Sequence, residues 1–391
     1  GVFVEGNQAA LDLIKVTREQ FLLVPPARIS PEFQPGGRRS AEAASEMIAL
    51  AYSKGWHRFD WTHVNAEGGE FIVDVLLIPV VIKGQTMLHV TWRDITERHR
   101  AEKFEQFRSH ILELLAGELP LPDILEAIVR GVEQLNPAML TSISLLDSQG
   151  RHLGKGVAPS LPDFYNTAID GLEIGMGVGS CGTAAFTGKR VIVEDIATHP
   201  YWTSYKELAA SAGLGACWSQ PILSSSGQVQ GTFAIYHHQA HAPAEADIYL
   251  IEQFAHLAGI AIDRNSTAET LRRQNSRLST IIENFPGAIS LVDADLRLVA
   301  HNRQFEQLLD LPDSLFARPD LSFVDIIRYN VERGEYGPGD PERQITEIVT
   351  RARNFQAHKI ERVRPNGVAL EVRGVPLPGG GFVTAYLDIT E

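Results

Sequence analysis

Two stretches of the chain, one near each end, alternate apolar and polar residues with the period of a half-buried β-strand. Near the start, such runs occupy residues 56–64, 70–82 and 87–95. Gly68 and Gly84 stand between the runs, and glycine readily adopts the backbone conformations of tight hairpin turns. The pattern predicts an antiparallel meander.

Near the end, the pattern returns at residues 355–363, 368–376 and 381–389. Asn366-Gly367, a strong hairpin dipeptide, lies between the first two runs. Each meander follows a short amphipathic helix that begins after an asparagine, Asn7 in EGNQAALDLIKV and Asn302 in AHNRQFEQLLDLP. Each also closes on Asp-Ile-Thr-Glu. We therefore expect two copies of one domain to bracket the chain.

Between the copies the pattern changes to that of a different domain. An amphipathic helix is expected at residues 123–136, and a hairpin at 141–147 and 151–157. Further strands are expected at residues 190–193, 216–222 and 229–237, and a long helix begins near residue 244.

The two terminal copies resemble the PAS family. The resemblance rests on the strand-Asn-helix opening, on VNAEGGEFIVDVLLIPV and WRDITE in the first copy, and on RPNGVALEVRGVPLP and YLDITE in the second. It implies PAS domains at residues 1–97 and 286–391. The first copy starts inside a strand-like run at residues 2–4, so we expect its initial strand to be truncated.

The middle third resembles the GAF family, through GVGSCGTAAFTGKRVIVEDIATHPYW, LGACWSQPILSSSGQVQGTFAIYH and LIEQFAHLAGIAIDR in that order. The resemblance implies a GAF domain at residues 119–262, with a signalling helix at 98–118 and a linker helix at 263–285. The expected fold class is α+β. Each domain is an antiparallel sheet with flanking helices and a small cavity, and coiled-coil-like helices join the domains.

The connecting helices carry an apolar repeat with spacings of four and three. In the second connector it runs through Leu250 to Phe285, and we predict a parallel homodimer seam at Phe254, Leu257, Leu271, Asn275, Leu278 and Ile282. Arg264 departs from the apolar pattern. Phe104, Phe107, Ile111 and Leu114 repeat the spacing in the first connector. The alternative is that these helices pack on their own domains.

Composition excludes several classes of partner and places the chain in the cytoplasm. The net charge of −13 disfavours nucleic acid. The two cysteines among 391 residues cannot form a disulfide framework. Because no apolar run approaches the ~18 residues of a membrane helix, membrane insertion is not expected.

The GAF resemblance implies a small-molecule pocket. Its candidate lining residues are Cys181, Thr183, Asp195, Trp202, Tyr205, Cys217 and Trp218. The GSCGTAA block is also similar to that of GAF-type free methionine sulfoxide reductases, but the second cysteine motif of those enzymes is absent. Packing of two buried cysteines, a redox-sensing pair and reductase chemistry therefore remain alternatives.

Other candidate sites lie in the PAS copies. Because alternation places His57, Phe59 and Trp61 on one strand face, they are candidates for a PAS pocket. The histidines form no metal-ligand motif, so no metal site is predicted. The cofactor is unknown, and haem held by a histidine stays open.

The Asp-Ile-Thr turns are candidates for signal relay, because Asp94, Thr96, Asp388 and Thr390 lie where a last strand meets the next segment. The sequence contains no nucleophile motif, phosphate loop or zinc spacing. We expect a sensory input module, not an enzyme, that controls an output domain following residue 391. Cyclic di-GMP turnover by GGDEF or EAL domains is the first expectation, and a sensor histidine kinase or a redox or haem-based sensor is the alternative.

Overall fold

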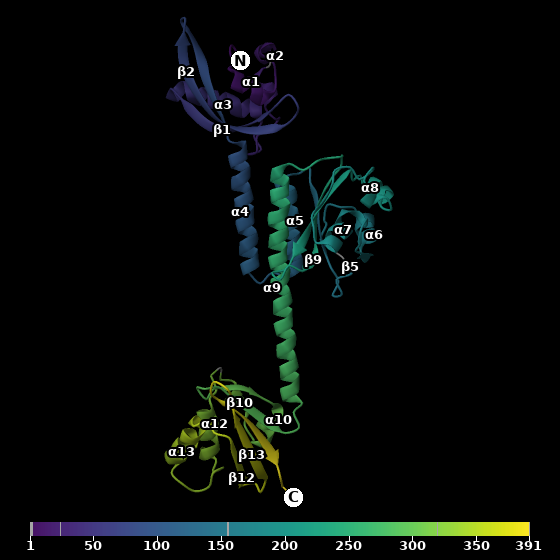
Figure 1. Ribbon diagram of the computed structural model, residues 1–391. Helices are drawn as coiled ribbons and strands as arrows, with labels where there is room; N and C mark the ends of the chain where they lie inside the picture. Colours follow the sequence, from purple (N-terminus) through teal and green to yellow (C-terminus); the bar gives the residue numbers. More distant parts are fainter. Residues whose placement is uncertain (1–2, 24, 155, 319, 391) are drawn as a thin grey trace. The chain divides into compact units, whose positions relative to one another are not determined.

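A computed structural model describes residues 3–23, 25–154, 156–318 and 320–390. The chain divides into two compact units, Gly1–Arg264 and Asn265–Glu391. The first contains two domains and the second contains one, and each domain is an antiparallel sheet with helices on it (Figure 1). The α+β class predicted from the sequence is confirmed.

The N-terminal domain has a sheet in the order β1-β2-β3, made by His57–Val64, Glu70–Ile82 and Gln85–Asp94. Three α-helices and one 3-10 turn precede it: α1 (Gln8–Ile14), α2 (Arg18–Leu23), η1 (Pro26–Ile29) and α3 (Ser40–Lys54). Asn7 begins α1, and its side chain accepts from the Ala10 N–H at 3.0 Å. Residues 3 and 4, which belong to the strand-like run, are not in a strand, and residue 2 lies outside the described residues.

The middle domain is built on a sheet in the order β4-β9-β8-β7. These strands are Leu140–Leu145, Val229–His237, Ala216–Leu223 and Val191–Val193. One face of the sheet packs on α5 (Leu121–Leu135) and α9 (Glu245–Glu283). The other face carries α6 (Asp163–Ile169), α7 (Gly179–Thr187), η2 (Pro200–Trp202) and α8 (Lys206–Ser211). A small ladder joins β5 (His152–Leu153) to β6 (Leu172–Glu173). Both faces of the sheet are therefore buried.

The first connecting helix, α4 (Thr96–Ala116), packs against the middle domain. The ring centroids of Phe104 and Phe107 lie 5.3 Å and 4.9 Å from that of Phe254 on α9. Gly131 of α5 admits the Phe107 ring, because a Cβ at Gly131 would lie 1.8 Å from it. The apolar repeat of α4 thus packs within its own chain.

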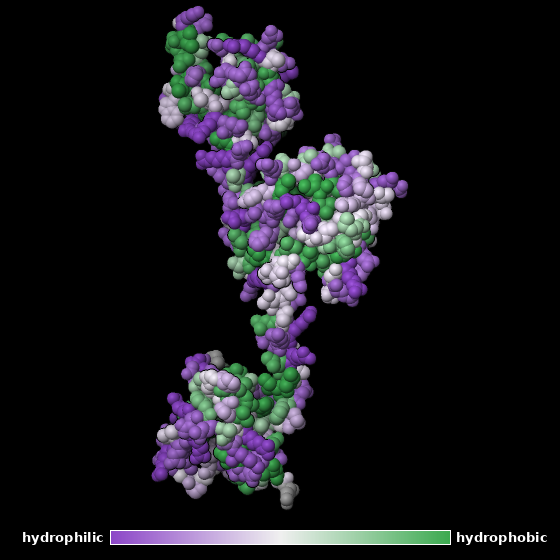
Figure 2. Space-filling view, viewed as in Figure 1, coloured by the Kyte–Doolittle hydropathy of each residue, from purple (hydrophilic) through white to green (hydrophobic). Residues whose placement is uncertain are grey.

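The apolar stripe of α9 splits into a buried and an exposed part. Phe254 and Leu257 are buried in the middle domain. This corrects their prediction as dimer-seam residues, because their side chains already pack in the core of their own chain. Leu271 and Leu278, by contrast, are 56% and 57% exposed. Apolar side chains are visible on this stretch of α9 in Figure 2.

Arg264, which breaks the apolar repeat, lies where the buried part of the stripe ends. Its guanidinium donates hydrogen bonds to the carbonyl oxygens of Leu115 and Gly117. These carbonyls belong to the C-terminal end of α4, where a helix leaves acceptors without partners. A cation is also favoured at that end of a helix dipole, so the arginine joins α9 to the end of α4.

The C-terminal domain has a sheet in the order β11-β10-β14-β13-β12. The strands in chain order are β10 (Ala288–Val292), β11 (Leu298–His301), β12 (His358–Val363), β13 (Ala369–Pro376) and β14 (Phe382–Asp388). Its helices are α10 (Arg303–Leu308), α11 (Asp313–Phe316), α12 (Phe323–Glu332) and α13 (Pro341–Arg353). Asn302 caps α10 as Asn7 caps α1. The predicted meander corresponds to β12, β13 and β14.

No helix within the described ranges has both the length and the apolar character needed to cross a membrane.

Candidate functional site

A small cavity lies in the middle domain between the sheet and the helices on its α7 side. Its volume is about 30 Å³, which is room for about one water molecule. The walls come from four helical segments and from the sheet, and the lining side chains that the argument uses are Cys181, Trp202, Tyr205, Tyr165 and Tyr236. The first three were predicted from the sequence. Tyr165 and Tyr236 were missed, because they lie 71 residues apart along the chain and meet only in the fold.

Backbone geometry at the start of α7 brings the wall close to the sheet. Gly177 and Gly179 both have positive φ, at 80° and 56°, a conformation that favours glycine. Ser180 donates to the Cys217 carbonyl oxygen at 3.0 Å and accepts from Nε1 of Trp202 at 3.0 Å. This one hydroxyl therefore connects α7, β8 and η2.

The Cys181 thiol lines the cavity, whereas Cys217 packs in the same buried cluster without lining it, which corrects the prediction of Cys217 as a pocket-lining residue. The interaction with the Cys217 thiol is the largest cause that lowers the pKa of Cys181 to about 6. The Tyr236 hydroxyl lies 3.6 Å from the Cys181 sulfur. Burial, reinforced by the neighbouring Cys181, raises the pKa of Cys217. One partly exposed acidic thiol and one buried weakly acidic thiol thus lie side by side.

Thr183 and Asp195 do not line the cavity but shape segments beside it. The Thr183 hydroxyl donates to the Gly179 carbonyl at 2.6 Å and accepts from the Gly177 N–H at 3.2 Å, which holds the loop before α7. Asp195 accepts from the Ala197 N–H and the Thr198 hydroxyl, as in an Asx turn. Their prediction as pocket-lining residues is corrected to a role in local structure.

Trp218 lies on the opposite face of the sheet from the cavity. It is buried in the core that α5 and α9 form, and its Nε1 donates to the His241 carbonyl at 3.2 Å. Successive residues of a strand point to opposite faces, so Cys217 and Trp218 cannot both face α7. The prediction of Trp218 as a pocket residue is therefore wrong.

In the N-terminal domain, His57, Phe59 and Trp61 share one face of β1, as predicted. The His57 and Phe59 ring centroids are 5.4 Å apart, and those of Phe59 and Trp61 are 5.7 Å apart. His57 Nε2 contacts the Met47 sulfur at 3.2 Å, and Trp61 Nε1 donates to the Ser30 hydroxyl at 3.0 Å. These side chains pack against α3 and the loop before it.

His63, further along β1, is a titratable residue with a buried side chain. It is buried, and its Nδ1 lies 2.7 Å from the Ile29 carbonyl oxygen. Its ring contacts Phe71 and Trp92. Burial lowers the pKa of His63 to about 4, so the imidazole is neutral near pH 7 and donates Nδ1–H to the carbonyl.

The two Asp-Ile-Thr turns have the same hydrogen-bond pattern. Asp94 Oδ1 accepts from the Thr96 N–H at 2.9 Å and from its hydroxyl at 2.6 Å. The Thr96 hydroxyl accepts from the Ile72 N–H on β2 at 2.9 Å. Asp388, Thr390 and Ala369 repeat these contacts in the C-terminal domain. Thr96 is the first residue of α4, so a hydroxyl joins the start of the helix to the central strand.

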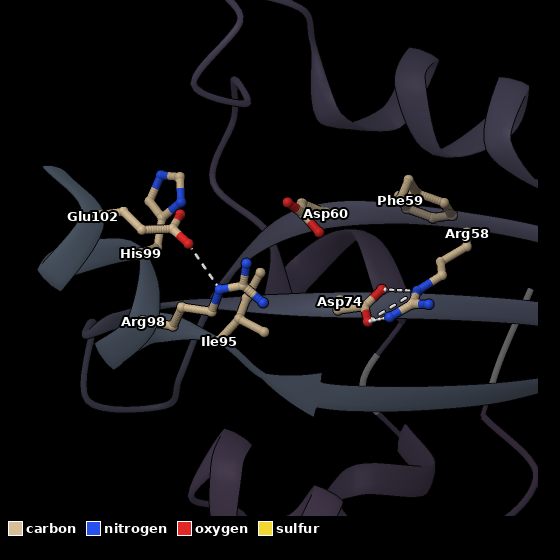
Figure 3. A pocket seen from close by; sticks show the side chains of 8 residues that line it. All are labelled: Arg58, Phe59, Asp60, Asp74, Ile95, Arg98, His99 and Glu102. Atoms are coloured by element: carbon tan, nitrogen blue, oxygen red, sulfur yellow. Dashed lines mark hydrogen bonds and ion pairs between the residues drawn. The ribbon is translucent and has the colours of Figure 1, made fainter. Parts of the chain in front are cut away.

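A charged groove of about 430 Å³ lies beside the turn at Asp94 and Thr96, where α4 begins (Figure 3). Arg58 and Asp74 form an ion pair on its sheet side, at 2.8 and 3.0 Å from Nε. Arg98 pairs with Glu102 at 2.8 Å on its helix side. No sequence pattern predicts this groove, because its walls are ordinary surface charges brought together by the fold.

The histidines do not combine into a metal site. Among the residues that the structure describes, no group of three or more histidine, cysteine, aspartate or glutamate side chains could hold a metal ion.

Comparison with known families matches three parts of the chain. Residues 1–97 match a model described as PAS domain, residues 118–263 match one described as GAF domain, and residues 282–391 match one described as PAS fold. The predicted order of PAS, GAF and PAS is confirmed.

A curated relative is the methyl sulfide methyltransferase-associated sensor of Methanosarcina acetivorans, 37% identical over 202 residues. The match covers 52% of this chain, and the chain spans about 20% of that relative. Among solved structures, free methionine-R-sulfoxide reductase from Neisseria meningitidis is 18% identical, over 42% of this chain and 91% of that one, with a TM-score of 0.34. The E. coli DhaR(N)-DhaL complex is 15% identical, over 76% of this chain and 91% of that one, with a TM-score of 0.36.

Proposed function

Since this chain consists of a PAS domain, a GAF domain and a second PAS domain in that order, we propose that it is a sensory input region whose GAF cavity binds a small ligand. The cavity beside α7 is the observation that carries the proposal. One thiol, several hydroxyl groups and aromatic rings line it together with aliphatic side chains, a mixture that suits a small ligand with a few polar groups.

Ligand entry requires part of the wall to move. A cavity of about 30 Å³ holds about one water molecule, so a metabolite fits only when η2 and α8 shift outward. Tyr205 is the half-buried residue between these two short segments. A ligand that favours the shifted arrangement changes the packing of α7 on β8, and the domain then has two states for a signal to select between.

The signal reaches the connecting helices through contacts within the chain and then between two chains. Asp94 and Thr96 couple the first sheet to α4, and Asp388 and Thr390 stand at the same place in the last domain. We restrict the proposed parallel homodimer seam to the exposed residues Leu271, Asn275 and Leu278 and the half-buried Ile282 of α9, since Phe254 and Leu257 lie in the GAF core. The input region has no catalytic role in this proposal.

The proposed output is synthesis or hydrolysis of cyclic di-GMP, and phosphotransfer by a histidine kinase is the alternative. The full-length protein assayed with GTP, with cyclic di-GMP and with ATP distinguishes these outputs. A visible absorption spectrum of the purified protein tests the further alternative of a haem-based sensor, because bound haem absorbs in the visible range.

Thermal-shift screening of metabolites tests the ligand proposal. A ligand that binds only the folded protein adds about 2.7 kcal/mol of stability at a hundredfold excess over its dissociation constant. We expect Tyr205→Ala to abolish the shift. Tyr201→Ala is the matched control, because Tyr201 is a half-buried tyrosine of the same segment that does not line the cavity. Metabolites that shift both variants like the wild type would place the binding site elsewhere.

A further inference from the structure

The two cysteines of the chain meet across the boundary between α7 and the sheet. Cys181 lies in the first turn of α7, and Cys217 lies in β8, where the Cys217 carbonyl accepts the hydrogen bond from Ser180. Both thiols are free and pack in one cluster. The Tyr236 hydroxyl lies 3.6 Å from the Cys181 sulfur, and Tyr236 is the strand partner of Cys217. The side chains thus approach each other from two elements that Ser180 holds in place.

The surroundings of Cys181 favour a thiolate. It is the third residue of α7, so its sulfur lies by the helix end that stabilises negative charge. Ser219 and Thr232 each have a buried hydroxyl with no hydrogen-bond partner among the described residues. Both hydroxyls also act on Cys181, as does the Tyr236 hydroxyl at 3.6 Å. A thiolate at Cys181 would accept from groups that otherwise lack an acceptor.

The two sulfurs differ in access to solvent. Cys181 is partly exposed and lines the cavity, whereas Cys217 is buried. The cavity of about 30 Å³ admits a molecule near the size of water, and hydrogen peroxide is of that class. An accessible acidic thiol beside a second thiol is the arrangement found in cysteines that respond to oxidants.

We propose that Cys181 and Cys217 form a reversible intramolecular disulfide when the chain meets hydrogen peroxide. The Cys181 thiolate attacks one peroxide oxygen, the O–O bond breaks, and the departing hydroxide takes up a proton and leaves as water. Cys181 is then a sulfenic acid. The Cys217 sulfur attacks the Cys181 sulfur and loses its proton, and the S–OH bond breaks to release a second water. Two thiols are oxidised and one peroxide is reduced, so atoms and electrons balance.

Disulfide formation would change the cavity itself. The Cys181 sulfur would exchange its contacts with Tyr236, Ser219 and Thr232 for a covalent bond to β8. The start of α7 would be tied to the sheet, and the sulfur could no longer serve the three hydroxyls as a thiolate acceptor. This chemistry goes beyond the proposed function, because it requires only the two thiols and an oxidant and no metabolite.

Peptide mapping after peroxide treatment tests the proposal on the purified chain. We expect the oxidised monomer to lose the mass of two hydrogen atoms, the peptides that contain Cys181 and Cys217 to be joined, and dithiothreitol to restore both thiols. In the Cys217→Ser variant, oxidation should stop at the sulfenic acid or a more oxidised form of Cys181. Cys181→Ser should leave Cys217 largely unoxidised, because that thiol is buried.

The pH dependence of oxidation gives a second readout. The rate at which hydrogen peroxide oxidises Cys181 should rise with pH around a midpoint of about 6, because the thiolate is the reactive form. Cys217→Ala removes the principal donor and should move that midpoint upward. Cys217→Ser, which keeps a hydroxyl donor, should move it less.

Three results would overturn the proposal: two intact thiols after peroxide treatment, sulfinic acid at Cys181 with Cys217 still free, or a disulfide that joins two chains. The ligand proposal is tested separately. A thermal shift with a metabolite but no disulfide after peroxide would contradict only the disulfide proposal. A disulfide without a thermal shift from any metabolite would contradict only the ligand proposal.

Discussion

At the scale of residues, burial decides which polar side chains carry a cost in free energy. His63 is enclosed by the Phe71 and Trp92 rings and bonded to the Ile29 carbonyl oxygen at 2.7 Å. Protonation would place a charge among aromatic rings and leave it poorly solvated. The folded N-terminal domain therefore resists protonation that the unfolded chain accepts freely.

This difference predicts how stability depends on pH. The pKa of His63 falls from 6.5 in the unfolded chain to about 4 in the folded one. The unfolded state binds the extra proton between these values, so stability is lost as pH falls from about 6.5 to about 4. The full loss from this group is about 3 kcal/mol, given about 1.4 kcal/mol per pKa unit.

The measurement is the free energy of unfolding of the N-terminal domain against pH for matched variants. His63→Asn keeps a donor for the Ile29 carbonyl but cannot titrate, so its curve should be flatter than that of the wild type over this range. His57→Asn, in the same strand, should keep the wild-type slope. Equal slopes for His63→Asn and wild type would show that another group controls the acid response.

The residues of the candidate site show what sequence pattern can and cannot give. Alternation along β1 correctly placed His57, Phe59 and Trp61 on one face, because they are more buried than Arg58 and Asp60 between them. The resemblance that put Trp218 in the pocket could not tell which face of β8 it occupies, since both faces of the GAF sheet are buried and β8 shows no alternation. Tyr165 and Tyr236 reach the cavity from α6 and β9, a meeting that depends on tertiary packing.

At the scale of elements, close helix packing at a glycine determines how α4 docks. Gly131 of α5 leaves space that the Phe107 ring fills, and a Cβ there would lie 1.8 Å from the ring. The strands of the two meanders were predicted within a few residues because turn glycines bound them, whereas β5 is shorter than predicted and β6, β10 and β11 had no predicted range. The helix against which the apolar stripe of α4 packs could not be predicted, because a 3-and-4 spacing is the same for packing within a chain and between chains.

We predict that Gly131→Ala has opposite effects in two backgrounds. In the wild type the new methyl group collides with Phe107, and overpacking of this kind costs about 1–3 kcal/mol. In a Phe107→Ala background the collision is gone, and the higher helix propensity of alanine should add up to about 1 kcal/mol.

A double-mutant cycle measured by denaturant unfolding of the GAF domain checks this prediction. A coupling energy of at least about 1 kcal/mol is expected, because the two residues are in direct contact. Additive effects of the two substitutions would mean that α4 does not pack on Gly131 in solution.

At the scale of the whole molecule, assembly depends on the part of α9 that its own domain leaves uncovered. Leu271 and Leu278 are more than half exposed, and Asn275 lies between them on the same stripe. In a parallel pair of helices, the leucines would be buried and the asparagine would fix the register.

Charged replacements at the two leucines should give monomers. Burying carboxylates in a dry seam costs several kcal/mol, so Leu271→Glu with Leu278→Glu should dissociate the dimer in analytical ultracentrifugation. Arg272→Glu with Arg277→Glu, at exposed positions off the stripe, is the matched control and should stay dimeric. A wild-type chain that sediments as a monomer would contradict the seam.

The hydrogen bonds from Arg264 to the end of α4 also define which side of α9 faces α4. An α-helix turns by about 100° per residue, so positions seven apart are offset by only about 20°. Leu271 and Leu278 therefore continue the side of α9 on which Arg264 meets the last carbonyls of α4. Before residue 264, that side of α9 packs within its own chain. After it, Leu271 and Leu278 on the same side are exposed to solvent. In the proposed dimer, one side of α9 would therefore be covered by the chain's own helix before residue 264 and by a second copy after it.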